Sequence, residues 1–238
     1  MAKDAKSAFC EDSRVKFPTL IHLMGMGFKY VSLKGLKTKY VEAPKTEFDP
    51  LTNILTDYFT DAYCTLNPKA EKKDAEDMLV KIQKSLQNDD LGRQFYNEIL
   101  LNTGERIIDL SSPANFYRNN TFQVTTEMTC GSKDSDNYRP DITIFVNGLP
   151  LAFIEVKKEN NHKGIQAETD RMKQRFVNPQ YRRFLNITQI MVFSNDMEYD
   201  NNEVTPTIGA FYATIGKKNT KYNCFREEGQ DSFPTARH

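Results

Sequence analysis

Two carboxylates and a lysine stand at the ends of two strand-like segments within residues 139–158, RPDITIFVNGLPLAFIEVKK. Asp141 opens the first segment, and Glu155 and Lys157 close the second. Because side chains alternate along a strand, Glu155 and Lys157 should share one face, while their apolar neighbours point to the other. A charge in such apolar surroundings is costly unless it is paired or binds a metal. The pattern therefore indicates either a functional site or an ordinary ion pair.

Metal-dependent phosphodiester hydrolysis would use these residue types. Mg²⁺ prefers oxygen ligands, commonly one or two carboxylates with waters and substrate phosphate, and a nearby lysine stabilises negative charge on the reacting phosphate. We therefore expect Asp141 and Glu155 to hold Mg²⁺, with the main-chain carbonyl of Val156 as a further ligand, and Lys157 to face water and phosphate. The Glu-x-Lys spacing alone is a weak signal, because residues 71–73 match it in what reads as a solvated helix.

The turn between the two strands constrains their register. Asn147-Gly148 favours a two-residue type I′ turn. Unbroken pairing outward from that turn would leave Asp141 and Glu155 on opposite faces of the sheet. Since a shift of one residue moves a side chain to the other face, a shared site predicts an odd-numbered loop or a bulge in this hairpin.

A basic stretch follows the second strand. Residues 171–183 contain five cationic residues and no acidic one. They are Arg171, Lys173, Arg175, Arg182 and Arg183. Next to a carboxylate cluster, such a stretch is suited to contact a phosphate backbone. A solvated helix face is the alternative interpretation.

The elements expected around these residues describe an α/β (α+β) protein. A helix at residues 20–27 and a strand come first, helical periodicity dominates residues 48–101, and segments rich in β-branched and aromatic residues follow. We predict strands at residues 105–110, 121–128, 141–147, 151–157, 187–195 and 209–216, with a helix at 164–176. This order predicts a mixed β-sheet flanked by helices, with N-terminal helical embellishment. We expect one domain over residues 1–238 with a helical insertion at about 46–101.

Composition restricts the partners and the compartment. The 238 residues include 32 Lys and Arg and 32 Asp and Glu, so the net charge does not indicate a nucleic-acid partner and any basic surface must be local. The four cysteines are scattered without a Cys-x-x-Cys pair, and we interpret them as reduced. No secretory signal and no apolar run long enough to span a membrane is present. We expect a cytoplasmic protein without a membrane partner.

The segment RPD…FVNGLPLAFIEVKK closely resembles the nuclease motif of type I restriction enzyme R subunits, members of the PD-(D/E)xK (RecB-like) nuclease superfamily. Its NGLPL hairpin is more specific than the acidic residues, and L-x-x-x-G-F-x-Y, FQVTTEM, VFSN and FYATIG occur in the expected order, so the likeness covers most of the chain. The resemblance implies a restriction-endonuclease-like fold. It identifies Asp141 with the Pro-Asp carboxylate, Glu155 and Lys157 with the E-x-K pair, and Glu11 with an accessory acid on the metal side.

One motif of the family is not matched here. Many relatives carry Q-x-x-x-Y on the helix after the E-x-K strand, where it contributes to the site. This chain reads GIQAETDRMKQRF in that region. Gln166, Arg171 and Gln174 are the candidates to take over the role.

The resemblance also implies an activity and partners. It points to a type I site-specific deoxyribonuclease that needs Mg²⁺ and cuts double-stranded DNA without reading its sequence, alongside methyltransferase (M) and specificity (S) subunits. No G-x-x-x-x-G-K-[ST] loop occurs, so we expect the ATP-driven motor to be absent and the chain to cleave weakly or not at all in isolation. The alternatives are a docking module between motor and methyltransferase, or another PD-(D/E)xK repair nuclease.

Overall fold

The computed structural model describes residues 15–37, 42–43, 45–131, 138–157, 164–194, 210–214 and 223–224. Its helices are α1 (Phe17–Gly25), α2 (Thr56–Leu66), α3 (Lys72–Ser85), the π-helix η3 (Phe95–Leu100), α4 (Pro113–Asn119), α5 (Gly164–Val177), the 3₁₀-helix η4 (Pro179–Tyr181) and α6 (Arg182–Ile187). Its strands are β1 (Lys29–Tyr30), β2 (Leu36–Lys37), β3 (Glu42–Ala43), β4 (Phe122–Thr126), β5 (Ile142–Val146), β6 (Leu149–Val156), β7 (Ile190–Ser194), β8 (Ala210–Thr214) and β9 (Asn223–Cys224).

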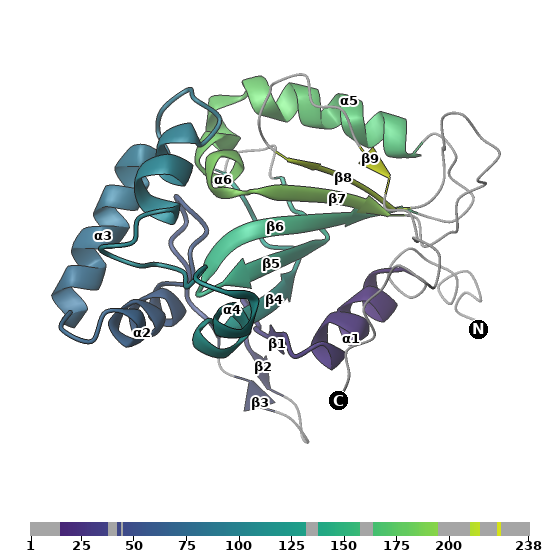
Figure 1. Cartoon of the computed structure of the whole chain (residues 1–238). Coiled ribbons are helices and arrows are strands. Elements are labelled where there is room, and N and C mark those ends of the chain that lie inside the picture. Colours follow the sequence, from purple (N-terminus) through teal and green to yellow (C-terminus); the bar gives the residue numbers. More distant parts are fainter. Residues whose placement is uncertain are drawn as a thin grey trace, which may run out of the picture.

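Seven of these strands form one mixed sheet in the order β1-β4-β5-β6-β7-β8-β9 (Figure 1). The pairs β1–β4 and β6–β7 are parallel, and the other pairs are antiparallel. The strands β6 and β7 are connected through α5, η4 and α6, because parallel neighbours need a long crossover connection. The strands β2 and β3 form a separate antiparallel pair. The predicted α/β class, with a mixed sheet flanked by helices, is confirmed.

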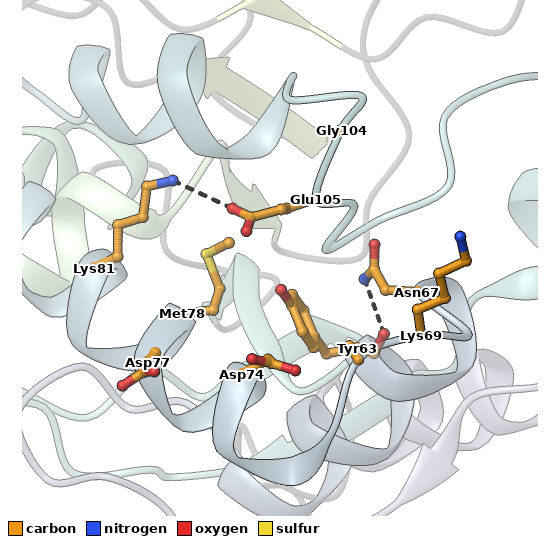
Figure 2. Close-up of a pocket in the computed structure, with 10 residues that line it drawn as sticks. Tyr63, Asn67, Lys69, Asp74, Asp77, Met78, Lys81, Gly104 and Glu105 are labelled. Atoms are coloured by element: carbon orange, nitrogen blue, oxygen red, sulfur yellow. Dashed lines mark hydrogen bonds and ion pairs between the residues drawn. The ribbon is translucent and has the colours of Figure 1, made fainter.

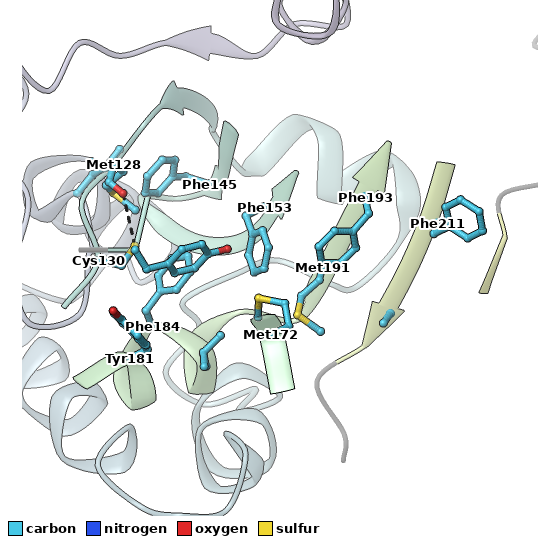
Figure 3. Close-up of a cluster of buried hydrophobic side chains, with 14 of the residues drawn as sticks. Met128, Cys130, Phe145, Phe153, Met172, Tyr181, Phe184, Met191, Phe193 and Phe211 are labelled. Carbon is cyan, nitrogen blue, oxygen red and sulfur yellow. Dashed lines mark hydrogen bonds between the residues drawn. The ribbon is translucent and has the colours of Figure 1, made fainter. Parts of the chain in front are cut away.

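The two faces of the sheet bury alternate residues of β6. Phe153 belongs to a core cluster that includes Met172 of α5, and Figure 3 shows these side chains together with the other aromatic and sulfur-containing members of the cluster. Ile154 belongs to a different cluster with Leu20 of α1. Figure 1 shows α5 and α1 on opposite sides of the sheet. Because Glu155 has the parity of Phe153, its side chain faces α5.

A third cluster covers the turn end of the β5–β6 hairpin. There Ile82 of α3 and Phe95 of η3 pack with Val146 and Leu149, and Figure 1 shows α2 and α3 at this end of the sheet. The Gly148 carbonyl accepts a hydrogen bond at 2.9 Å from the backbone nitrogen of Leu55, the residue that precedes α2. The helices that the periodicity of residues 48–101 predicted are present, and they cover the turn end of the hairpin.

The predicted strand at residues 105–110 is wrong. This segment has no regular secondary structure, and its consecutive residues Ile107 and Ile108 are both buried against the helical cluster. Asparagine side chains satisfy its backbone instead of a neighbouring strand. Asn67 bonds both backbone groups of Arg106, and Asn120 bonds both backbone groups of Asp109. Short apolar runs do not reveal such side-chain partners, so the β-rich composition was misleading.

The first helix begins earlier than predicted. α1 starts at Phe17, three residues before the expected Leu20, because Pro18 is tolerated in the first turn and its fixed φ suits a helix. It ends before Gly27, which has φ of +102°, as a glycine stop should. None of the described helices is long and apolar enough to cross a membrane.

Candidate active site

The β5–β6 hairpin contains the predicted irregularity. Asn147 and Gly148 have φ of +52° and +76°, as a type I′ turn requires. The pairing Phe145–Pro150 near the turn gives way to Ile144–Ala152, so one residue of β6 is bulged out. The bulge prediction is confirmed. The pairing Ile142–Ile154, continued by one residue, brings Asp141 opposite Glu155 and onto the same face.

Asp141 is held directly at the open end of the hairpin. Its Oδ2 accepts a hydrogen bond from the Val156 nitrogen at 2.9 Å, which spans the two strands beyond their last pair. Its carbonyl accepts from the Glu127 nitrogen at 3.2 Å. Glu127 has φ of +51° and its carboxylate lies 2.7 Å from Nζ of the buried Lys16. The Asp141 backbone is therefore tied to β4 and its side chain to β6.

Glu155 is a buried acid with an incompletely satisfied carboxylate. The residue is 5% exposed, and among the described residues its Oε1 has no hydrogen-bond partner. The nearest cation to that oxygen in a described ion pair is Nη1 of Arg175, at 3.8 Å. Burial raises the pKa of Glu155 to about 8, and the Glu168 and Asp141 carboxylates raise it further, whereas Lys157 and the Tyr138 side chain oppose the rise. A metal ion that replaced the proton would relieve both burial and repulsion.

Lys157 turns back onto the end of β6. Its Nζ donates to the Val156 carbonyl at 3.0 Å and lies 3.5 Å from Oε2 of Glu168, and its side chain is 14% exposed. Its backbone nitrogen bonds to the Ser194 carbonyl of β7 at 2.8 Å. The predicted ligand oxygen of Val156 thus already contacts the ammonium group, and the second lone pair of a carbonyl can still meet a cation.

The sequence reasoning missed Glu168, the acid that α5 contributes to this end of the sheet. Its carboxylate lies 2.7 Å from Nη1 of Arg175 and 3.0 Å from Nη1 of Arg171. Arg175 also stacks 3.8 Å from the ring centroid of the buried Tyr138. One signal was available: Glu168 precedes Met172 by four residues, so it shares the buried face of an amphipathic helix.

Of the other predicted site residues, Lys173, Gln174, Arg182 and Arg183 have described side chains. Lys173 and Gln174 are exposed on α5, and Lys173 pairs with Asp170 at 3.1 Å. Arg182 donates to the Gln87 carbonyl at 3.4 Å, whereas the Arg183 Nε is buried without a described partner. Gln166 lies in α5, but its side chain is outside the described residues, and Glu11 also lies outside them. The structure brings Arg171 and Arg175 to the acidic cluster, whereas Lys173 and Arg182 have their described contacts outside it.

The donor set at the hairpin end fits a hard divalent cation. Asp141 and Glu155 provide carboxylate oxygens, one of which is buried and lacks a hydrogen-bond partner among the described residues. Across the described ranges, no three His, Cys, Asp or Glu side chains form a group that could hold a metal ion by themselves. Mg²⁺ is commonly bound by only one or two carboxylates, with waters and substrate phosphate completing its shell.

A pocket elsewhere in the molecule does not overlap this site. It lies between α2, α3 and the start of the segment at residues 105–110. Its lining includes Tyr63, Asp74 and Glu105 (Figure 2). Glu105 pairs across it with Lys81 at 3.5 Å, and both side chains are about half exposed. Burial raises the pKa of Tyr63, with smaller effects of Glu105 and Asp74. None of the described residues that line this pocket belongs to the hairpin end.

Comparison with known proteins identifies the family. No curated protein sequence matches the chain. A family model described as type I restriction enzyme R protein N terminus (HSDR_N) matches residues 9–204, which include the whole β5–β6 hairpin and α5. The chain therefore belongs to the family of type I restriction enzyme R protein N-terminal regions.

Proposed function

We propose that this chain is a Mg²⁺-dependent endonuclease domain that hydrolyses phosphodiester bonds of double-stranded DNA without reading their sequence. The observation that carries the proposal is the bulged hairpin. A regular hairpin with this turn would separate Asp141 from Glu155, whereas the one-residue shift aligns them beside Lys157. Folding alone does not require two acids and a lysine at the end of a strand pair whose other residues are mostly apolar.

The chain's own residues divide the work. Asp141 and Glu155 would hold the cation, with the Val156 carbonyl at the same edge. Bound Mg²⁺ would supply a Lewis acid that polarises the scissile phosphate. The Lys157 ammonium group lies close enough to Glu155 to oppose the rise of its pKa, and from there it would contact the phosphate and stabilise the charge that develops during attack.

The family match supports the partners and the setting of this activity. We propose that the domain acts within a complete R subunit, whose motor uses ATP, and with M and S subunits that select the DNA. Exposed cations of α5, such as Arg171 and Lys173, would contribute local contacts to the phosphate backbone. Because the net charge is zero, DNA binding by this chain alone should be weak and should fall steeply with salt.

Metal binding and cleavage test the proposal on matched variants. Mn²⁺ binding to the chain is measured by calorimetry for the wild type, Asp141→Asn and Glu155→Gln, with Glu105→Gln as the control far from the hairpin end. Both site variants should weaken Mn²⁺ binding by at least about tenfold and abolish cleavage by the complete enzyme, and the control should change neither. Mn²⁺ binding that is absent, or indifferent to both site variants, would contradict the proposal and favour a docking module.

A further inference from the structure

Glu168 is the most enclosed acid at the hairpin end, at 1% exposure. Its two carboxylate oxygens have different partners. Oε1 lies 2.7 Å from Nη1 of Arg175, while Oε2 lies 3.0 Å from Nη1 of Arg171 and 3.5 Å from Nζ of Lys157. Arg175 thus anchors one oxygen, while the other is shared between Arg171 and the Lys157 ammonium group at the end of β6. Through Lys157, the carboxylate connects α5 to the end of β6, the strand that precedes it in the chain.

Packing does not account for this acid. Its helical neighbour Met172 is buried in the core cluster between α5 and the sheet, so an apolar residue at position 168 would suit the same face. Buried ion pairs give little net stability compared with apolar side chains of similar volume, because desolvation offsets their attraction. The acid therefore calls for a role that depends on its charge.

Lys157 has few other means of keeping its orientation. A lysine side chain has four rotatable carbons and a compact charge that accepts many directions. Besides Glu168, Lys157 contacts the carbonyl of the adjacent residue Val156 and interacts electrostatically with Glu155, and both of these residues belong to the same strand end. A comparable ion pair, Lys81–Glu105, has the same 3.5 Å separation, but its side chains are 50% and 56% exposed, against 14% and 1% here. Only the enclosed pair should restrict its lysine strongly, because exposed pairs are screened.

We propose that Glu168 is a positioning residue that holds the Lys157 ammonium group at the end of β6, where it contacts the scissile phosphate. This role rests on the proposed nuclease function. Glu168 does not itself contact the phosphate; it acts through Lys157, and Arg175 keeps its carboxylate turned toward that lysine. Glu168, an acid in the interior of α5, thereby contributes to the site. α5 is also the helix on which this chain lacks the Q-x-x-x-Y motif of the family.

The first test measures the tether without cleavage. The full chain is labelled with an amine-reactive acetyl ester, and the rate at each lysine is read by mass spectrometry. In Glu168→Gln, Lys157 should be modified at least about threefold faster than in the wild type, because the side chain is released, while Lys173 should be unchanged. Glu105→Gln, which removes the exposed pair of equal length, should leave the Lys157 rate unchanged. If Glu168→Gln does not fold, Glu168→Met removes the same charge with a similar volume. An unchanged Lys157 rate in a folded variant would overturn the tether.

The second test asks whether the tether serves cleavage. In the complete enzyme with Mg²⁺, Glu168→Gln should slow cleavage by about tenfold or more, but added to Lys157→Ala it should cause no further loss beyond about twofold, as expected for residues that act as a unit. Independent losses would overturn the positioning role and indicate a structural one. Failure of the wild type to cleave, with the Lys157 labelling still dependent on Glu168, would instead refute the proposed nuclease function, and the role in cleavage with it.

Discussion

A buried acid lies near each end of the β5–β6 hairpin, and the two acids differ in how well their carboxylates are hydrogen-bonded. Near the turn end, Asp109 accepts hydrogen bonds from Ser111 and Asn119, with Arg106 also nearby. These neutral donors lower the pKa of Asp109 to about 2, and the Arg106 charge adds a smaller effect in the same direction. At the open end, Glu155 lacks a partner for Oε1 among the described residues, and burial raises its pKa to about 8.

From this difference we infer that Asp109 serves the structure, whereas Glu155 suits the proposed metal site. The Asp109 carboxylate is satisfied by Ser111 and Asn119, and the Asp109 backbone joins a network of amides that reaches the turn through Asn120 and Asn147. Glu155 faces the carboxylates of Asp141 and Glu168, so its charge opposes folding until something neutralises it. Buried polar groups that are only partly satisfied point to a ligand, whereas satisfied ones point to structure.

Lys157→Ala should produce the largest effect, and on function only. Removing its ammonium group should reduce cleavage by the complete enzyme by about a hundredfold or more, equivalent to on the order of 3 kcal/mol in the barrier. ATP hydrolysis and translocation should stay near wild type, because the substitution removes no part of a nucleotide site. Both activities are measured on one preparation. Cleavage within a few-fold of wild type would exclude Lys157 from the mechanism, and parallel loss of both activities would indicate misfolding.

Glu155→Gln should increase the stability of the metal-free chain at alkaline pH. The pKa of Glu155 is raised in the folded state, so its contribution to stability is present below about pH 4.5 and is lost as the pH rises through about 8. The variant should not lose stability in this way. At pH 8 its free energy of unfolding should exceed that of the wild type by on the order of 3 kcal/mol.

The measurement is urea unfolding of both proteins in a metal chelator at pH 4.5 and pH 8. At pH 4.5, where Glu155 is protonated in the folded protein, the two free energies of unfolding should nearly agree. Mg²⁺ should restore stability to the wild type at pH 8 and not to the variant. Identical pH profiles in chelator would show that burial does not disfavour the Glu155 charge.

Asn147→Ala tests the turn end, where the opposite outcome is expected. The Asn147 side chain is fully buried, accepts from the Thr121 nitrogen and donates to the Ile107 carbonyl and to Asn120. Its loss should lower the free energy of unfolding by about 2 kcal/mol at neutral pH, measured by chemical denaturation. Asn147→Gly removes the same bonds but relieves the positive φ, so it should be less harmful than alanine. Equal losses would mean that hydrogen bonds alone determine the cost.

Asp109→Asn should have the smallest effect, mainly on acid stability. Because the pKa of Asp109 is lowered in the folded state, its contribution is present above about pH 4 and is lost as the pH falls through about 2. The variant should be less stable than the wild type at neutral pH, and its stability should decline less between pH 4 and pH 2. Acid titrations followed by circular dichroism would reveal this. Superimposable titrations would assign the network to the asparagines alone.

Local pattern was sufficient to predict the hairpin and its register. Alternation along β6 predicted that Glu155 and Lys157 share a face, and the Asn147-Gly148 turn together with Asp141 predicted a register shift that the structure contains. These predictions depended on residues close in sequence and on the fixed two-residue period of a strand. The strand context and the Pro-Asp pair upstream then favoured Glu155 and Lys157 over the other E-x-K match at residues 71–73.

Only the tertiary structure decided which charges meet. Glu168 reaches Lys157 because the crossover places α5 over β6, and the same packing turns Arg175 inward to Tyr138 instead of outward to solvent. The segment at residues 105–110 has strand-like composition, yet distant asparagines satisfy its backbone. By itself, the sequence was enough to predict the two strands of the hairpin, their turn and the residues at its open end. It could not determine pairings across elements, because burial and electrostatic partners depend on distances that arise only when the sheet and its helices pack.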